Sequence, residues 1–149
     1  MQAPLEILLV EDNEGDVEMT RRALRDSKPA CNVSVANNGI EALNFLHRQG
    51  QFSDAPAPQI ILLDLNMPRM DGKKFLEIMK EDTTLKAIPV IMLTSSGAPT
   101  DIQECYERHA NCYVVKPFDG KEFMEAVRQV VSFWISLGRI PHRTAVCCN

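Results

Sequence analysis

Short apolar runs alternate with longer amphipathic stretches along this chain, and that alternation restricts its fold more than any other feature. A strand buried on both faces of a parallel sheet reads as a continuous apolar run, whereas a covering helix repeats apolar residues every three or four positions. Strands are expected at 5–10, 32–36, 60–64, 90–93 and 112–115, and helices at 14–27, 39–50, 72–81, 100–108 and 120–137. The pattern predicts an α/β fold, a doubly wound parallel sheet of five strands with five helices.

The domain organisation follows from the length. A chain of 149 residues fits one domain with a sizeable core, and the five strand–helix pairs use nearly all of it. We expect residues 1–137 to form this domain and residues 138–149 to be a C-terminal tail, with no output domain. Residues 51–58 contain two prolines and are expected to be a loop.

The composition narrows the location and the partners. The net charge is −4 and no block of Lys and Arg occurs, so a nucleic acid is not an expected partner. Neither a signal peptide nor an apolar stretch of membrane-spanning length is present, so we expect a cytoplasmic protein without membrane contact. The five cysteines lack zinc-site spacing and are expected to be free thiols, and the role of Cys147 and Cys148 stays open.

Polar residues follow four of the five predicted strands. The first strand ends in Glu11 and Asp12, the third in Asp64, the fourth in Thr94 and the fifth in Lys116. Ligands of open parallel sheets bind at the carboxyl ends of the strands, so we expect these side chains to meet at one edge.

The predicted cluster has the chemistry of phosphoryl transfer. Three carboxylates held together repel one another, and a hard cation with oxygen ligands, Mg²⁺ above all, relieves that repulsion. Lys116 and Thr94 supply a charge and a hydroxyl for phosphoryl oxygens, and Asp64, on the middle strand of the group, is the expected nucleophile. Taken singly, Asp12 could instead cap the following helix, Thr94 could be structural and Lys116 could be solvated.

Four segments resemble the receiver domains of bacterial two-component response regulators, the CheY-like family with its flavodoxin-like fold. Residues 62–72 (LLDLNMPRMDG) resemble the phosphoacceptor signature of that family. Residues 10–13 (VEDN), 93–95 (LTS) and 115–118 (VKPF) resemble its other three motifs in order and spacing. The resemblance runs from Ile7 to about Leu137.

The resemblance implies a signalling protein of a phosphorelay. Asp64 would receive a phosphoryl group from a sensor histidine kinase, and the protein would catalyse nothing beyond its own phosphorylation and dephosphorylation. Asp12, Asp64 and the backbone carbonyl of Asn66 would bind Mg²⁺, with Glu11 helping to hold the ion and its waters.

The resemblance also implies how the phosphoryl group is read. Thr94 and Lys116 would contact its oxygens, and Lys116–Pro117 would be a cis peptide bond. Thr94 would move toward the phosphoryl group and Tyr113 would rotate inward, so that protein–protein contacts change.

A finer likeness is to the small response regulators paired with cyanobacterial phytochromes. It rests on residues 51–58, the strand at 111–113 (NCY) and residues 132–134 (SFW). It implies a phytochrome-type kinase, a role in light signalling, homodimers as in those relatives, and a possible downstream phosphotransfer protein.

The last predicted helix has more apolar surface than one sheet face needs. Its apolar residues surround the helix, and the expected homodimer interface consists of Val130, Phe133, Trp134 and Leu137. Alternatively, the tail of the chain folds over this surface.

Other functions are weaker candidates. A haloacid-dehalogenase-type phosphatase would carry its nucleophile after the first strand, and a flavodoxin-like cofactor binder would not place Glu11 and Asp12 where a phosphate binds. A phosphorylation-independent interaction module would not need the complete set of acceptor-site residues that this sequence contains, so it is also a weaker candidate.

Overall fold

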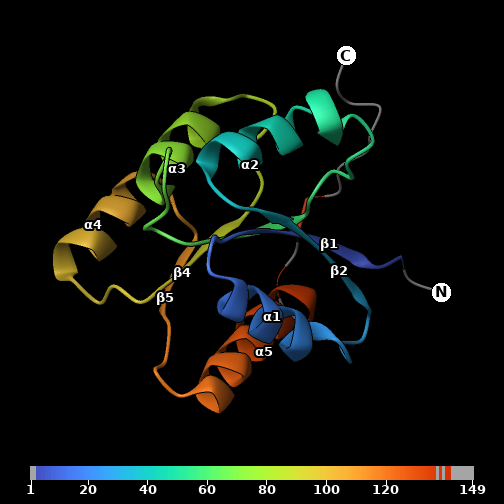
Figure 1. Cartoon of the computed structure of the whole chain (residues 1–149), viewed down its shortest axis with the longest axis vertical. Coiled ribbons are helices and arrows are strands. Elements are labelled where there is room, and N and C mark those ends of the chain that lie inside the picture. The colour runs from blue at the N-terminus through green and yellow to red at the C-terminus, as the bar shows by residue number, and fades with distance from the viewer. Residues whose placement is uncertain (1–2, 137, 139, 142–149) are drawn as a thin grey trace.

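The computed structural model describes residues 3–136, 138, 140 and 141. Its centre is a five-stranded sheet in the order β2-β1-β3-β4-β5, with every neighbouring pair parallel. The strands are β1 (Leu5–Val10), β2 (Cys31–Ala36), β3 (Ile60–Leu63), β4 (Val90–Thr94) and β5 (Cys112–Val115). The helices are α1 (Glu14–Leu24), α2 (Gly39–Leu46), α3 (Gly72–Glu81), α4 (Pro99–Glu107) and α5 (Gly120–Ser136). The predicted doubly wound α/β fold is confirmed (Figure 1).

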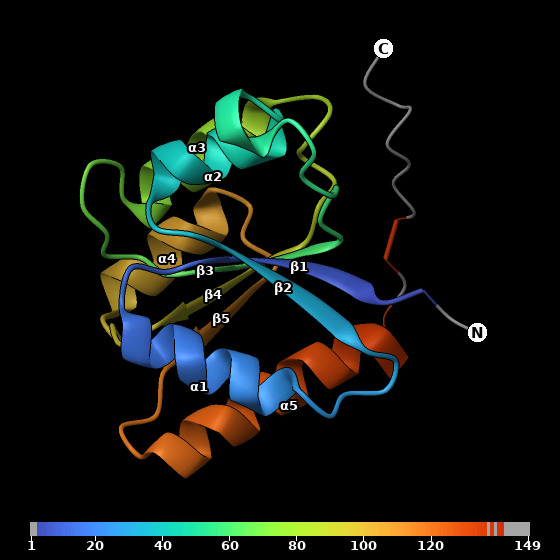
Figure 2. The same cartoon turned by 45° about the vertical axis from the view of Figure 1, so that its right-hand side comes forward.

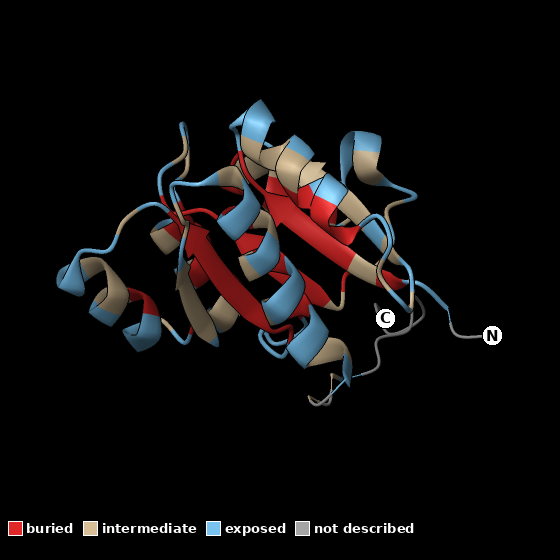
Figure 3. Cartoon of the chain, turned by 90° about the horizontal axis from the view of Figure 1, so that it is seen from below, coloured by how far each residue is buried: buried red, intermediate tan, exposed pale blue. Residues whose placement is uncertain are grey.

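The helices divide between the two faces of the sheet. α1 and α5 lie on one face, and α2, α3 and α4 lie on the other (Figure 2). Successive residues of β1 point to opposite faces, so Ile7 and Leu9 join the core under α1 and α5, whereas Leu8 and Val10 join the core under α2 and α3. Both faces of β1, β3 and β4 are buried, which explains why these strands read as continuous apolar runs (Figure 3).

The strand at 31–36 is the edge strand that its alternating sequence suggests. Most of its residues are half-buried, since one side of β2 has no neighbouring strand. β3 occupies the centre of the sheet, and all four of its residues are fully buried. Asp64, directly after β3, therefore leaves the middle of the sheet.

Helix ends differ from the sequence prediction. α1 ends at Leu24 instead of Ser27, where the Arg25 N–H donates to the Arg22 carbonyl and tightens the last turn. α2 ends at Leu46, because Arg48 and Gly50 have positive φ angles of 55° and 60° that a helix cannot continue. The predicted loop at 51–58 begins inside a short 3-10 helix, Gly50–Phe52.

Two expectations from composition bear on the described residues. Cys31, Cys105 and Cys112 are free thiols, as predicted. None of the helices within the described ranges has both the length and the apolar character needed to cross a membrane.

Candidate functional site

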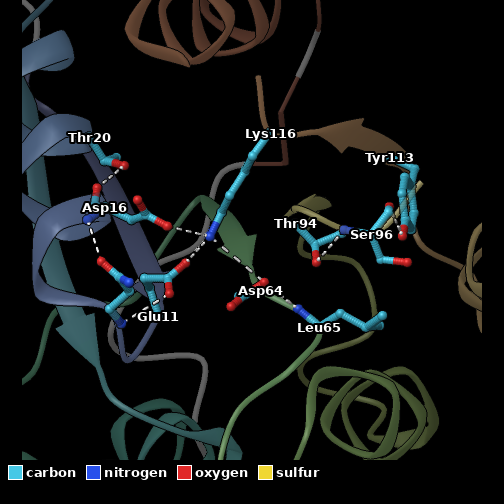
Figure 4. A network of polar contacts seen from close by, with 10 residues as sticks. Glu11, Asp16, Thr20, Asp64, Leu65, Thr94, Ser96, Tyr113 and Lys116 are labelled. Carbon is cyan, nitrogen blue, oxygen red and sulfur yellow. Dashed lines mark hydrogen bonds and ion pairs between the residues drawn. The ribbon is translucent and has the colours of Figure 1, made fainter. Parts of the chain in front are cut away.

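The strand ends bring the predicted site residues to one edge of the sheet. The Asp64 N–H donates to the Val10 carbonyl at 3.0 Å, which joins the ends of β3 and β1. The Lys116 N–H donates to the Thr94 carbonyl at 2.7 Å, which does the same for β5 and β4. The side chains of Glu11, Asp64, Thr94 and Lys116 consequently lie in one polar group (Figure 4).

Asp64 lies at the bottom of this group and is only 8% exposed. The Leu65 N–H donates to its Oδ1 at 2.8 Å and so fixes the rotation of the carboxylate. The following loop returns tightly, because the Gly72 N–H donates to the Leu65 carbonyl at 2.7 Å. A Cβ at position 72 would lie 2.3 Å from the Asp64 carbonyl oxygen, so this approach requires glycine.

Three carboxylates form the acidic part of the site. Oxygens of Glu11, Asp12 and Asp64 all lie within 4.8 Å of one another, with Glu11 and Asp64 buried and Asp12 exposed. Burial, together with the charge of Asp64, raises the pKa of Glu11 to about 7 even though Lys116 opposes the shift. Carboxylate charge is therefore in excess here, and the oxygen ligands suit a hard divalent cation such as Mg²⁺.

Asp12 does not cap the following helix. The N-cap of α1 is Asn13, whose Oδ1 accepts from the Asp16 N–H at 2.9 Å. The capping alternative is therefore wrong, and the Asp12 carboxylate belongs to the acidic cluster.

Lys116 supplies the positive charge of the site. Its Nζ lies 2.6 Å from Glu11 Oε2, 2.8 Å from Asp16 Oδ2 and 3.8 Å from Asp64 Oδ1. Burial lowers the pKa of this ammonium, but the hydrogen bonds to Asp16 and Glu11 and the charge of Asp64 outweigh burial and raise it. The ammonium is charged and enclosed by carboxylates, as the phosphoryl-binding role requires.

The expected cis bond at Lys116–Pro117 is wrong. The cis peptide bond among the described residues joins Lys28 and Pro29. With a trans bond before Pro117, the Lys116 N–H still continues the pairing with β4, and the Nζ still reaches its carboxylates. Trans is also the preferred state of such a bond.

Thr94 and Tyr113 are linked through Ser96. Thr94 is fully buried, and its Oγ1 accepts from the Ser96 N–H at a long 3.4 Å. The hydroxyl of the half-buried Tyr113 donates to the Ser96 carbonyl at 2.8 Å, so the ring lies beside Ser96 (Figure 4). The Ser96 hydroxyl lies 2.5 Å from Asp101 Oδ2 on α4. A displacement of Thr94 would therefore be felt at both Tyr113 and α4.

The two remaining groups of predicted residues lie farther out. Asn66 is exposed in the loop after β3, and metal binding by its carbonyl stays a prediction.

On α5, Val130 and Trp134 are half-buried against the core under α1, and Phe133 is 51% exposed with its ring edge-on to Trp134 at 5.7 Å. Leu137 lies outside the described residues. Ile140, from the tail, packs against the same core, in line with the alternative that the tail covers part of this surface.

Sequence reasoning missed Asp16, and it missed the link that Ser96 makes between Thr94 and Tyr113. Asp16 lies in the first turn of α1, but its partner Lys116 is 100 positions away along the chain, so no local pattern indicates the contact. Ser96 acts partly through its backbone, which a residue pattern does not reveal.

The fold and site together are those of a response regulator receiver domain. The family model of that description matches residues 7–128, and the chain belongs to this family. Response regulator Rcp1 of Synechocystis sp. is 37% identical over 138 residues, which cover 93% of this chain and 94% of Rcp1.

Solved structures give the same picture. The phosphorylated cyanobacterial phytochrome response regulator RcpA superposes with a TM-score of 0.91 at 37% identity, over 94% of this chain and 100% of that one. The Mn²⁺-bound form of Rcp1 gives a TM-score of 0.88 at 37% identity, over 93% and 100%. The predicted likeness to phytochrome response regulators is confirmed.

Proposed function

We propose that this chain is a response regulator of a phosphorelay that accepts a phosphoryl group from a sensor histidine kinase on Asp64. The observation that carries the proposal is the convergence of buried Asp64, two neighbouring carboxylates and the charged Lys116 at the edge of the sheet. Members of the receiver family serve in signalling. The proposed function requires one reaction of this chain, the transfer of a phosphoryl group to Asp64 and its later removal.

The transfer uses one oxygen of the Asp64 carboxylate. Because Oδ1 is held by the Leu65 N–H, Oδ2 is the oxygen left to attack phosphorus. The new O–P bond forms while the N–P bond of the donor phosphohistidine breaks, and the electron pair of that bond returns to the imidazole nitrogen. Lys116 and Thr94 receive the phosphoryl oxygens, because both lie beside Asp64 at neighbouring strand ends.

Mg²⁺ fits this donor set. Asp12, Asp64 and the carbonyl of Asn66 would hold the ion, with Glu11 behind them. When bound, the ion supplies positive charge that offsets the charge of the phosphoryl group and of the carboxylates. The close approach of the three carboxylates supports this assignment, since a divalent cation offsets their mutual repulsion.

The readout passes through Thr94, Ser96 and Tyr113. Phosphorylation adds charge and acceptor oxygens at Asp64, which draw the Thr94 hydroxyl from its long contact with the Ser96 N–H. The Tyr113 hydroxyl and α4 both bond to Ser96, so the surface of α4 (Pro99–Glu107), β5 and α5 changes its contacts.

The partners follow from the relatives. The RcpA structure is that of a cyanobacterial phytochrome response regulator, which supports a phytochrome-type histidine kinase as the donor and a role in light signalling. The exposed Phe133 beside Trp134 supports a homodimer through α5. A downstream phosphotransfer protein is a further candidate partner, and a cytoplasmic location fits all three.

The test is phosphorylation by acetyl phosphate in the presence of Mg²⁺, followed by intact-protein mass. The wild-type chain should gain one phosphoryl group, and Asp64→Asn should gain none because the nucleophile is lost. Asp71→Asn is the matched control, since Asp71 is an exposed carboxylate in the same loop and asparagine can still cap α3. Labelling of Asp64→Asn at the wild-type level would contradict the proposal. Transfer from a phytochrome kinase, compared with other histidine kinases, tests the donor.

A further inference from the structure

Within the described part of the chain, Asp16 is the one close partner of Lys116 that lies outside the acidic cluster. The cluster comprises Glu11, Asp12 and Asp64, whose oxygens share one small volume. Asp16 reaches Lys116 from the first turn of α1 (Figure 4). Because its carboxylate is not part of that cluster, its role differs from that of a metal ligand.

The backbone of Asp16 is held in a fixed position. Its N–H donates to the N-cap Asn13, and its carbonyl accepts from the Thr20 hydroxyl at 2.8 Å. The side chain is 23% exposed, and a carboxylate in the first turn is favoured by the helix dipole. The start of α1 therefore fixes the point from which the Asp16 carboxylate reaches Lys116 Nζ at 2.8 Å.

The three N–H donors of the Lys116 ammonium have different partners. Glu11 at 2.6 Å and Asp16 at 2.8 Å accept two of them, whereas Asp64 Oδ1 at 3.8 Å is beyond hydrogen-bond length. The third donor is left for the side of the site on which a phosphoryl oxygen would arrive. The nucleophilic carboxylate stays free of a direct bond to the lysine.

We propose that Asp16 is a positioning residue that, together with Glu11, holds the Lys116 ammonium off Asp64 until a phosphoryl oxygen takes the third donor. This inference rests on the proposed function. Without the Asp16 charge, the ammonium is drawn to the next carboxylate within reach, Asp64, and a direct bond there makes that carboxylate a poorer nucleophile. Asp16 therefore speeds the acceptance of phosphate without touching the reacting atoms.

The experiment compares four chains with acetyl phosphate and Mg²⁺: wild type, Asp16→Asn, Asp16→Glu and Glu14→Gln. Asp16→Asn should label about tenfold more slowly, the size expected when a charge-assisted hydrogen bond is lost. Asp16→Glu keeps the charge and should restore most of the rate. Glu14→Gln removes the same charge from the same exposed turn, away from Lys116, and should label as wild type. Asp16→Ala repeats the test if the asparagine variant folds poorly in a thermal melt.

Two further readouts separate positioning from a merely structural role. A crystal structure of Asp16→Asn should show the distance from Lys116 Nζ to Asp64 Oδ1 shortened from 3.8 Å to hydrogen-bond length. In a Lys116→Met background, Asp16→Asn should have no further effect on the labelling rate, because Asp16 acts through the lysine.

The outcomes distinguish the two proposals. Wild-type rates in Asp16→Asn with an unchanged lysine position, or faster labelling, would overturn the role of Asp16 and leave Asp64 as the acceptor. Failure of the wild-type chain to label would overturn the proposed function itself.

Discussion

The acceptor edge and the outer surface of α5 are built in contrasting ways. At the edge, the functional side chains lie at strand ends or directly after them, and backbone bonds join Asp64 to the end of β1 and Lys116 to the end of β4. On α5, the position of Phe133 is set by the helix, but its ring is 51% exposed and its value depends on what comes to cover it.

The difference between the two regions indicates that the acceptor edge carries the chemistry and that the surface of α5 contacts partner proteins. The edge is buried, crowded and charged, so small changes of geometry there have large effects. The exposed residues of α5 can change without disturbing the fold, since the buried side chains of Phe123, Val127 and Val131 hold the helix on the sheet. Acceptance of phosphate should accordingly be sensitive to single atoms, and partner choice should be adjustable.

The largest effect is expected from Gly72→Ala, which tests how tightly the edge is built. The added methyl would overlap the Asp64 carbonyl, so the loop must shift, and we expect a loss of about 2–3 kcal/mol in the free energy of unfolding together with slow labelling. Urea denaturation and acetyl phosphate labelling measure the two effects. Gly97→Ala is the control, because a Cβ there would make only ordinary contact with Val115 at 3.9 Å. Equal stability of both variants would contradict the account.

The second prediction concerns the surface of α5. Phe133→Ser should weaken the proposed homodimer at least tenfold, because an exposed aromatic residue at an interface commonly dominates its affinity. Phosphorylation at Asp64 should still proceed, which would show that the two regions act independently. Sedimentation at several concentrations measures dimerisation, and Phe118→Ser, an exposed phenylalanine before α5, is the control. A monomeric wild type would remove the basis for the dimer.

The third prediction concerns pH in metal-free buffer with a chelator. The folded-state pKa of Glu11, about 7, lies above its ordinary 4.5, so its protonated form favours the folded state. That contribution is present below pH 4.5 and is lost as the pH rises through 7. The stability of wild type relative to Glu11→Gln should therefore fall between pH 5 and pH 8. Thermal melts across this range provide the measurement, and a difference that does not vary with pH would count against the raised pKa.

The smallest effect is expected at the link between the two regions. Tyr113→Phe removes the donor to the Ser96 carbonyl and should cost about 1 kcal/mol in the free energy of unfolding. Labelling of Asp64 should remain within about twofold of wild type, because Tyr113 contacts neither the carboxylates nor Lys116 through any bond found in the described residues. A large loss of labelling would contradict this account, because it would mean that Tyr113 acts within the acceptor site.

The same contrast explains what the sequence could predict. Ile60–Leu63 could be identified as a central strand because it is apolar throughout, and Asp64 and Lys116 followed as strand-end residues. Where α2 ends depends on positive φ angles at Arg48 and Gly50, of which only the glycine is visible in the sequence. The ion pair of Asp16 with Lys116 joins residues 100 positions apart, so no local pattern could reveal it.

Two expectations, one from resemblance and one from the residues themselves, show what the sequence could not predict. The cis bond at Lys116–Pro117 was carried over from a motif, but the lysine reaches its carboxylates with a trans bond. The apolar surface of α5 was judged from the residues alone, and Val130 and Trp134 prove to be partly used by the core of their own chain. Surfaces depend on tertiary packing in a way that strand ends do not.

The central claim is that Asp64 itself carries the phosphoryl group. Borohydride reduces an acyl phosphate to the alcohol, so treatment of the protein after incubation with acetyl phosphate and Mg²⁺ should convert one aspartate to homoserine. Peptide mass spectrometry should then locate homoserine at position 64. Conversion at another aspartate, with position 64 unchanged, would contradict the account.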